Sequence, residues 1–424
     1  MPSILSPVPS LDLTPDERRM LDGREGEAVG TAMRILTRAA AAMRADRLLE
    51  IASAHIDGCL YHGRAGLDFA ERLLAGGATV SVPATLNVSS LDLLHPELVR
   101  LDDGTRERAN RLMDAYVAMG CRPTWTCAPY QLPDRPSFGE HVAWAESNAI
   151  VFANSVLGAR TNRYGDFIDI CAAITGRVPD HGLHTDEGRR ATLQLRLHGV
   201  PDRLLDQDLL YPVLGHLLGR RVESAVAAID GLPAGTSEDR LKAIGAAAAS
   251  SGSVALFHAI GITPEAPTWD AVAADGAREE VVTLPDLRVA RDELSKVPDG
   301  ADIGAVSVGT PHASEEELRH LTELVVEMHP CVPFYVNTGR AQLAAIGGLA
   351  DALADADVTI VTDTCTYITP VLPDLTGPVM TDSGKWAWYA PSNLGVEVAL
   401  GSLEDCVRSA ATGVVTRDER LWAG

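Results

Sequence analysis

Four short apolar runs, separated by segments with helical spacing, constrain the fold of this chain more than any other feature. The runs occupy residues 303–309, 332–338, 358–364 and 378–384, and they read IGAVSVG, VPFYVNT, VTIVTDT and PVMTDSG. Amphipathic segments such as SEEELRHLTELVVEM separate them. Because parallel strands need crossover connections, this alternation predicts a doubly wound βαβ region, a parallel sheet with helices on its faces.

Polar or ligand-type residues follow each of these four runs. In parallel α/β sheets, binding sites form beyond the carboxyl ends of the strands. We therefore expect the polar groups to meet at one edge of the sheet. They are Thr310–His312, Asn337–Arg340, Asp363–Cys365 and Ser383–Lys385.

The whole chain has 424 residues, which is too long for one ordinary core. Changes in composition and in the rhythm of elements place boundaries near residues 190 and 290. We expect an N-terminal α/β region with Cys127 at residues 1–190, a middle α/β region at 191–290, and a C-terminal parallel α/β region with Cys365 and Lys385 at 291–424.

Charge, hydropathy and cysteine usage exclude several classes of protein. A formal net charge of -22 argues against nonspecific binding to nucleic acid or to an acidic membrane, which needs clustered Lys and Arg. No apolar run approaches the roughly 20 residues that span a bilayer, and the first residues lack the pattern of a secretory signal. Seven cysteines without a CxxC pair do not indicate a disulfide framework. These features predict a reduced, cytoplasmic protein with neither nucleic acid nor membrane as a partner.

Two cysteines stand in loops rather than in apolar elements. Cys127 lies in the stretch TWTCAPY before a proline, and Cys365 follows the third apolar run in the stretch DTCTYITP. Two thiolates far apart in sequence can bind one metal centre, an iron–sulfur cluster included. On spacing alone, two inert thiols fit these positions as well. The apolar or helical surroundings of four other cysteines indicate core positions: Cys121, Cys171, Cys331 and Cys406.

A helix is expected after Cys127. The residues Ser137–Glu140 have the form of a capping box that opens a helix, and apolar residues follow at helical spacing: Val142, Ala145, Ala149, Phe152 and Val156. Glu146, Asn148 and Asn154 are weak choices on such a helix if they are merely exposed, although a lone polar residue on a helix is usually solvated. Arg160 follows in the exit loop, where a guanidinium can bind a carboxylate or phosphate through two hydrogen bonds.

A second polar cluster, His55, Asp57 and His62, lies in a predicted turn, although a plain connection with surface histidines fits it equally. Motifs of other enzyme classes are missing from the sequence. There is no P-loop, no GxGxxG after a strand, no HExxH and no GxSxG. This argues against a nucleotide-dependent enzyme or a serine hydrolase.

Several long stretches of the chain together resemble the large component of aconitase X, a branch of the aconitase superfamily. The resemblance runs from about residue 10 to about residue 415. It rests on the motifs AHIDG, VPATLNVSSLD, TWTCAPY, GEHVAWAESNAIVFANSVLGARTNR, HAIGITPEAP, DTCTYITP and MTDSGKWAWYAPSNLGVEVALGSLEDCV. It implies an aconitase-like fold of mostly parallel sheets flanked by helices.

The resemblance also implies a dehydratase with an iron–sulfur centre. Cys127 and Cys365 are expected to hold the cluster as its metal ligands. Catalytic roles are expected for Lys385, Ser383 and Glu146, the last as a neighbour or ligand of the cluster. Substrate-binding roles are expected for Asn87, Ser147, Asn148, Arg160, His55, Asp57 and His312.

One position departs from the family pattern. Archaeal members that act on mevalonate 5-phosphate have a third cysteine in a GCPH-type motif, whereas this chain has Thr310 in the sequence Gly309–His312. A threonine is a poor iron ligand. The departure resembles the bacterial members that convert cis-3-hydroxy-L-proline to Δ1-pyrroline-2-carboxylate and carry a two-iron centre, so it favours that substrate and a [2Fe–2S] cluster.

The family also uses a small swivelling domain, which we expect as a separate partner subunit in a heterodimer. Two alternatives remain open. The chain can belong to a dehydratase of mevalonate 5-phosphate, or it can be a scaffold subunit that has lost its cluster.

Overall fold

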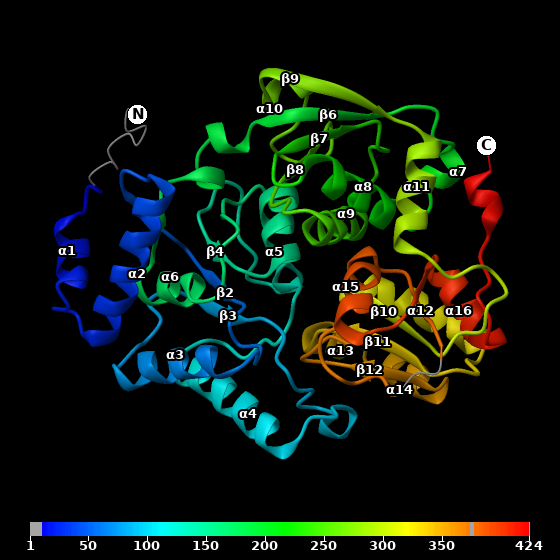
Figure 1. Ribbon diagram of the computed structural model, residues 1–424, viewed down its shortest axis with the longest axis horizontal. Coiled ribbons are helices and arrows are strands. Elements are labelled where there is room, and N and C mark those ends of the chain that lie inside the picture. Colours follow the sequence, from blue (N-terminus) through cyan, green and yellow to red (C-terminus); the bar gives the residue numbers. More distant parts are fainter. Residues whose placement is uncertain (1–10, 374–376, 424) are drawn as a thin grey trace, which may run out of the picture.

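The computed structural model describes residues 11–373 and 377–423, which form several sheets flanked by helices (Figure 1). The sheets are parallel except for one antiparallel pair, β1 (Leu48–Glu50) with β5 (Arg177–Pro179). The predicted α/β class is confirmed. Within the described ranges, no helix has the length and apolar character needed to cross a membrane.

The C-terminal sheet has the strand order β12-β11-β10-β13-β14, and every neighbouring pair is parallel. Its strands are β10 (Ala305–Ala313), β11 (Phe334–Thr338), β12 (Val358–Val361), β13 (Val379–Thr381) and β14 (Val398–Leu400). The four apolar runs predicted from the sequence therefore do form neighbouring parallel strands.

Alternate residues of this sheet enter two different cores. Val306 and Val308 pack with α12 (Glu315–Glu327), α14 (Leu349–Asp355) and α16 (Leu403–Thr412), whereas Ala305 shares a core with α15 (Gly384–Leu394). Because side chains alternate between the two faces of a strand, helices cover both faces. The doubly wound arrangement is confirmed. The helix α13 (Arg340–Ile346) follows β11.

The middle sheet has the order β8-β7-β6-β9 and is also parallel. Its strands are β6 (Ala191–Leu197), β7 (Ala227–Asp230), β8 (Phe257–Ala259) and β9 (Ala273–Val282). Its helices are α7 (Asp202–Leu205), α8 (Leu210–Val222), α9 (Glu238–Ser251), α10 (Trp269–Val272) and α11 (Leu284–Leu294). Figure 1 shows α8 and α9 between this sheet and α15, and α9 packs directly on α15.

The N-terminal region has a small parallel sheet of order β3-β2-β4, formed by β2 (Ala54–Ile56), β3 (Ala84–Leu86) and β4 (Ala143–Trp144). Its helices are α1 (Pro15–Leu21), α2 (Glu27–Met43), α3 (Arg64–Ala75), α4 (Asp103–Ala118), α5 (Ser147–Phe152) and α6 (Ile168–Thr175). The Thr14–Glu17 capping box starts α1 as its sequence indicates, with both reciprocal hydrogen bonds present.

Two sequence predictions are wrong. The helix expected from Ser137 begins only at Ser147, because the backbone of residues 142–145 bonds as a strand: the N–H of Ala143 donates to Ser53 and that of Ala145 donates to His55. Of the predicted capping box, only the hydrogen bond from the Ser137 N–H to Glu140 forms. Cys331, expected in the core, is exposed because it lies before β11 begins.

Candidate active site

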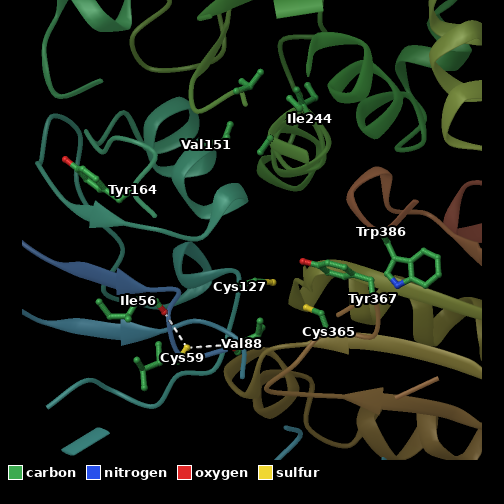
Figure 2. Packing of buried hydrophobic residues seen from close by; sticks show 14 of the residues in the cluster. Ile56, Cys59, Val88, Cys127, Val151, Tyr164, Ile244, Cys365, Tyr367 and Trp386 are labelled. Atoms are coloured by element: carbon green, nitrogen blue, oxygen red, sulfur yellow. Dashed lines mark hydrogen bonds between the residues drawn. The ribbon is translucent and has the colours of Figure 1, made fainter. Parts of the chain in front are cut away.

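The two loop cysteines lie next to each other although 238 positions separate them in the chain, 365 minus 127. Cys127, Cys365 and His312 have their potential ligand atoms within 4.8 Å of one another, and all three residues are buried. Figure 2 shows Cys127 and Cys365 close together, beside Tyr367. The carboxyl ends of β10 and β12 deliver His312 and Cys365, so the predicted sheet edge is where they meet.

The two thiols differ in their readiness to ionise. Burial raises the pKa of the Cys127 thiol, but a hydrogen bond from Cys365 and the electrostatic effect of His312 and Lys385 outweigh burial and lower this pKa to about 6. Donation of that hydrogen bond, together with burial, raises the pKa of the Cys365 thiol well above its ordinary value. The pair thus holds one thiolate and one thiol at neutral pH, and thiolate is the form that binds metals.

His312 orients Cys127 rather than presenting a free ring nitrogen. Its backbone N–H donates to Cys127 Sγ at 3.3 Å. Its Nδ1 lies 3.1 Å from Thr126 Oγ1, and its Nε2 lies 3.1 Å from the carbonyl oxygen of Thr364. Because both ring nitrogens have partners, the sulfur atoms are the better metal donors here. Two buried thiols side by side fit an iron–sulfur centre.

Lys385 and Glu146 form a buried ion pair beside the thiols. Lys385 Nζ lies 2.5 Å from Glu146 Oε1, and the two side chains are 3% and 6% exposed. Burial alone would lower the pKa of the Lys385 ammonium, but Glu146 outweighs burial and holds this pKa well above its ordinary value. Lys385 is therefore a cation at neutral pH. Its Nζ also lies 5.8 Å from the centre of the Tyr367 ring, a cation–π distance.

Helix α5 starts at this ion pair. Glu146 is its N-cap and accepts the N–H of Ala149 at 2.8 Å, which explains an acid at this position. Asn148 donates to Glu146 and also to the carbonyl oxygen of Cys127 at 2.9 Å. Ser147 Oγ lies 3.4 Å from Glu146 Oε1. The Glu146–Asn148 stretch thus connects the Cys127 loop to Lys385.

Asp57, Asn87 and His55 gather at the carboxyl ends of β2 and β3. Asn87 Nδ2 donates to Asp57 Oδ1. Burial and the charges of Glu146 and Asp166 raise the pKa of the Asp57 carboxyl to about 7. Burial lowers the pKa of His55 to about 3, so His55 is neutral, and its Nδ1 lies 2.7 Å from Thr85 Oγ1.

Two buried atoms of this group, His55 Nε2 and Asn87 Oδ1, make no hydrogen bond of ordinary geometry among the described residues, although the Asn87 side chain lies near enough to His55 to act on its pKa. Buried polar atoms are ordinarily satisfied. Such atoms beside a carboxyl of pKa about 7 indicate a place for a polar ligand.

Ser383 caps α15, and its hydroxyl group is engaged in hydrogen bonds within the chain. Its Oγ accepts the N–H of Trp386 at 3.1 Å and donates to the carbonyl oxygen of Thr310. The hydroxyl therefore fixes the start of α15, two residues before Lys385.

Three family models together match nearly the whole chain. The aconitase X first domain matches residues 10–187, the second domain residues 191–297 and the third domain residues 303–412. The chain belongs to the aconitase X family. The resemblance read from the sequence motifs is confirmed.

Individual aconitase X relatives match over the same length. The cis-3-hydroxy-L-proline dehydratase of Pseudomonas aeruginosa is 43% identical, over 94% of this chain and 69% of that protein. The phosphomevalonate dehydratase large subunit of Methanothermobacter thermautotrophicus is 38% identical, over 92% of this chain and 97% of that protein. The crystal structure of Thermococcus kodakaraensis aconitase X in its holo-form has a TM-score of 0.85 and 33% identity, covering 94% of this chain and all of that one. The aconitase-like architecture is thus confirmed, and both sequence relatives are dehydratases.

Arg160 makes its polar contacts elsewhere in this aconitase X chain. Its guanidinium donates to Asp186 and to the carbonyl oxygen of His184. Its backbone pairs with His141, just before β4, whereas Glu146 lies beyond the other end of that strand. The structure does not bring Arg160 to the cysteines, and its role as a substrate ligand stays a prediction.

Sequence reasoning missed a clasp between two loops of the aconitase X fold. Asp92 accepts the backbone N–H of Thr362 at 2.8 Å, and Asp363 accepts that of Leu93 at 3.1 Å. Arg340 binds Asp363 through two hydrogen bonds of 2.6 Å. The clasp fixes the residues directly before Cys365 to the N-terminal region. Nothing in the spacing of these residues signals it.

Proposed function

We propose that this chain is the large subunit of a hydro-lyase that dehydrates cis-3-hydroxy-L-proline to Δ1-pyrroline-2-carboxylate. The observation that carries the proposal is the buried Cys127–Cys365 pair, with the Lys385–Glu146 ion pair beside it. The name and the 43% identity of the Pseudomonas aeruginosa relative support the substrate.

In this proposal Cys127 and Cys365 hold an iron–sulfur cluster, with [2Fe–2S] favoured because Thr310 stands where a third cysteine would be needed. When bound, the iron acts as a Lewis acid on the leaving hydroxyl group. His312 and Asn148 keep Cys127 in place through its sulfur and its carbonyl oxygen.

The chain's own side chains bind the substrate and manage its charge. Lys385 is cationic and holds the substrate carboxylate, where negative charge develops as the Cα proton leaves. Asn87 and His55 form hydrogen bonds with the substrate through Asn87 Oδ1 and His55 Nε2, the atoms that lack partners in the described structure. Glu146, Ser147, Asn148 and Ser383 position Lys385 and the start of α5.

Asp57 is the group on this chain best suited to accept the Cα proton. Its pKa of about 7 lies near neutral pH, where a general base is most effective. A base supplied by the small subunit is the alternative. Activity that survives Asp57→Asn in the presence of the small subunit would favour that alternative.

We also propose a heterodimer with a small swivelling-domain subunit, in the cytoplasm. The name of the Methanothermobacter relative, a large subunit, supports a separate partner. The division of the chain near residues 190 and 290 is proposed as three structural domains, each with its own parallel sheet.

A substrate assay with cluster analysis tests the proposal. The chain is purified without oxygen, with and without the small subunit, and offered cis-3-hydroxy-L-proline or mevalonate 5-phosphate. We expect iron and sulfide in the protein, and a product one water lighter from cis-3-hydroxy-L-proline alone. Turnover of mevalonate 5-phosphate only would overturn the substrate. A colourless, iron-free protein would support the cluster-less scaffold.

A further inference from the structure

Two adjoining cavities lie where the middle region meets the C-terminal sheet, and the smaller of them borders Lys385. The larger has a volume of about 350 Å³ and the smaller of about 50 Å³. They share the lining residues Pro212, Ala243, Gly309, Glu317 and Asp382. The smaller cavity is also lined by Thr310, Ser383 and Lys385, so the pair of cavities runs from the candidate active site to a wider space.

The walls of the larger cavity carry more carboxylates than cations. The carboxylates are Asp208, Asp239, Glu316, Glu317 and Asp382, and the lining also includes His320 and Arg240, whose Nε lies 2.7 Å from Asp208 Oδ1. Two of the carboxylates are neutralised by Lys242, which is 4% exposed and lies 2.7 Å from Asp239 and 2.5 Å from Glu317. A wall of this charge repels a substrate carboxylate. Moreover, 50 Å³ is too little for a pyrrolidine ring with its substituents, although it exceeds what a water molecule needs.

Two polar groups of the smaller cavity have few partners or none in the described ranges 11–373 and 377–423. Thr310 Oγ1 is buried and makes no hydrogen bond. The Asp382 carboxylate is half-buried, and the one hydrogen bond that lowers its pKa comes from its own backbone N–H. Buried water commonly satisfies such groups where two to four polar atoms line a space of this size.

The proposed reaction needs a route of this kind. When the Cα–H bond breaks, the base receives a proton; when the Cβ–O bond breaks, the leaving hydroxide takes a proton from an acid and becomes water. The site is then left with a protonated base and a deprotonated acid. Before the next turnover, the base must release its proton, the acid must regain one, and one water molecule must leave.

We propose that waters in the smaller cavity lead from the candidate active site beside Lys385 to Asp382, that the site exchanges protons with the larger cavity through Asp382, and that the eliminated water leaves by the same path. The inference rests on the proposed dehydratase function. Asp382 acts through the waters and is a relay residue, not a group that touches substrate.

The surroundings of Asp382 suit this exchange. Burial and the charge of Glu317 on α12 raise the pKa of its carboxyl to about 7, Asp208 adds to that effect, and Lys242 on α9 opposes it. A group with this pKa both accepts and releases protons at neutral pH.

Asp382→Asn tests the relay, because asparagine keeps the shape but does not titrate. In the cluster-loaded enzyme with its small subunit, we expect kcat for cis-3-hydroxy-L-proline to fall about tenfold while KM stays within about twofold, a smaller effect than removal of a direct acid or base. Added imidazole should restore much of kcat, since a small acid–base molecule can replace the relay. The matched control is Asp180→Asn, a carboxylate 18% exposed and paired with Arg47 beside β5, for which imidazole should have no effect.

Thr310→Val provides a second variant that keeps side-chain shape and removes only the hydroxyl. It should lower kcat in the same direction, and a crystal structure of the wild-type protein should show ordered water in the smaller cavity. Unchanged kcat in Asp382→Asn, or a loss that imidazole does not restore in a variant with normal thermal stability, overturns the relay. If wild-type enzyme turns over cis-3-hydroxy-L-proline in those experiments, the proposed function stands although the relay fails.

Discussion

Lys385 Nζ lies 2.5 Å from Glu146 Oε1, and the two side chains are 3% and 6% exposed. The pair joins α15 of the C-terminal sheet to the N-cap of α5 in the N-terminal region. Removing one partner of a buried pair leaves an uncompensated charge, which ordinarily costs about 3–5 kcal/mol. We therefore expect Glu146→Ala to lower the free energy of unfolding by about that amount.

The matched control is the double variant Glu146→Gln with Lys385→Met, which removes both charges and keeps a hydrogen-bond acceptor at the N-cap. It should be closer in stability to the wild type than Glu146→Ala is, as measured by chemical denaturation. Because Glu146 raises the pKa of Lys385, this contribution is full below the ordinary lysine pKa of about 10.4 and is lost only as pH rises above it. Equal stability of all three proteins would contradict a buried charged pair.

Cys127→Ser and Cys365→Ser are expected to abolish iron binding, because serine hydroxyl groups do not ionise near neutral pH and are poor iron ligands. The measurement is iron and sulfide per chain after purification without oxygen. Cys331→Ser, at the exposed cysteine, and Cys171→Ser, at a buried one, serve as controls and should leave both contents unchanged. Full iron content in Cys127→Ser would contradict the site.

Removal of the metal should expose the unequal ionisation of the two thiols. In metal-free protein, the wild type should show a thiolate absorbance that the Cys127→Ser variant lacks. This absorbance should appear with a midpoint at about pH 6, because Cys365 and Lys385 favour the ionised Cys127. The thiol is present below that pH and the thiolate above it. Cys365→Ser removes the donor sulfur and should shift the midpoint upward. A midpoint near the ordinary cysteine pKa of about 8.5 would contradict the arrangement.

The Asp92–Asp363 clasp should govern how firmly Cys365 is held. The Asp92 carboxylate accepts hydrogen bonds from the N–H and the hydroxyl group of Thr362. Asp92→Asn replaces one of its two accepting oxygens with an NH₂ group, which can only donate. We expect faster loss of iron to a chelator, with a smaller change in the unfolding midpoint. Asp102→Asn, at the exposed N-cap of α4, removes a similar carboxylate far from Cys365 in sequence and should not speed iron loss. Equal rates of iron loss would argue against the clasp.

The sequence predicted those parts of the fold and site that depend on local periodicity. The four apolar runs became β10 to β13, and their polar ends brought Cys365, His312 and Lys385 to one sheet edge. The helix expected from Ser137 failed because residues 142–145 are a continuous apolar run that also suits a buried strand, and pairing of β4 with β2 decides the outcome. Periodicity over so few residues does not distinguish the two.

Contacts between distant segments were beyond sequence reasoning. Asp92 binds Thr362, which lies 270 residues further along the chain. The Arg160 guanidinium, expected at the substrate site, binds Asp186 instead. Both outcomes depend on where the domains place neighbouring loops, and no residue type or spacing encodes that. Asp169 is a similar case. Its place in the first turn of α6 predicts nothing unusual from the sequence, but in the fold it is buried and accepts the backbone N–H of Asp57.

Asp169 should make the protein less stable as pH rises toward neutrality. Burial raises the pKa of its carboxyl from 3.8 to about 7. The folded state therefore binds more protons than the unfolded state between these values, and the free energy of unfolding falls with rising pH across that window, by at most about 1.4 kcal/mol per pH unit for one group. Asp169→Asn resembles the protonated acid and should flatten the decline.

Chemical denaturation at a series of pH values between about 4 and about 7 measures this slope. Asp57 has a pKa raised to about 7 in the same way, so a residual slope should remain in the variant. Asp102→Asn is the control, because the pKa of the exposed Asp102 is lowered and its titration lies below the window. A slope in Asp169→Asn as steep as in the wild type would mean that the Asp169 carboxyl already ionises in the folded protein below pH 4.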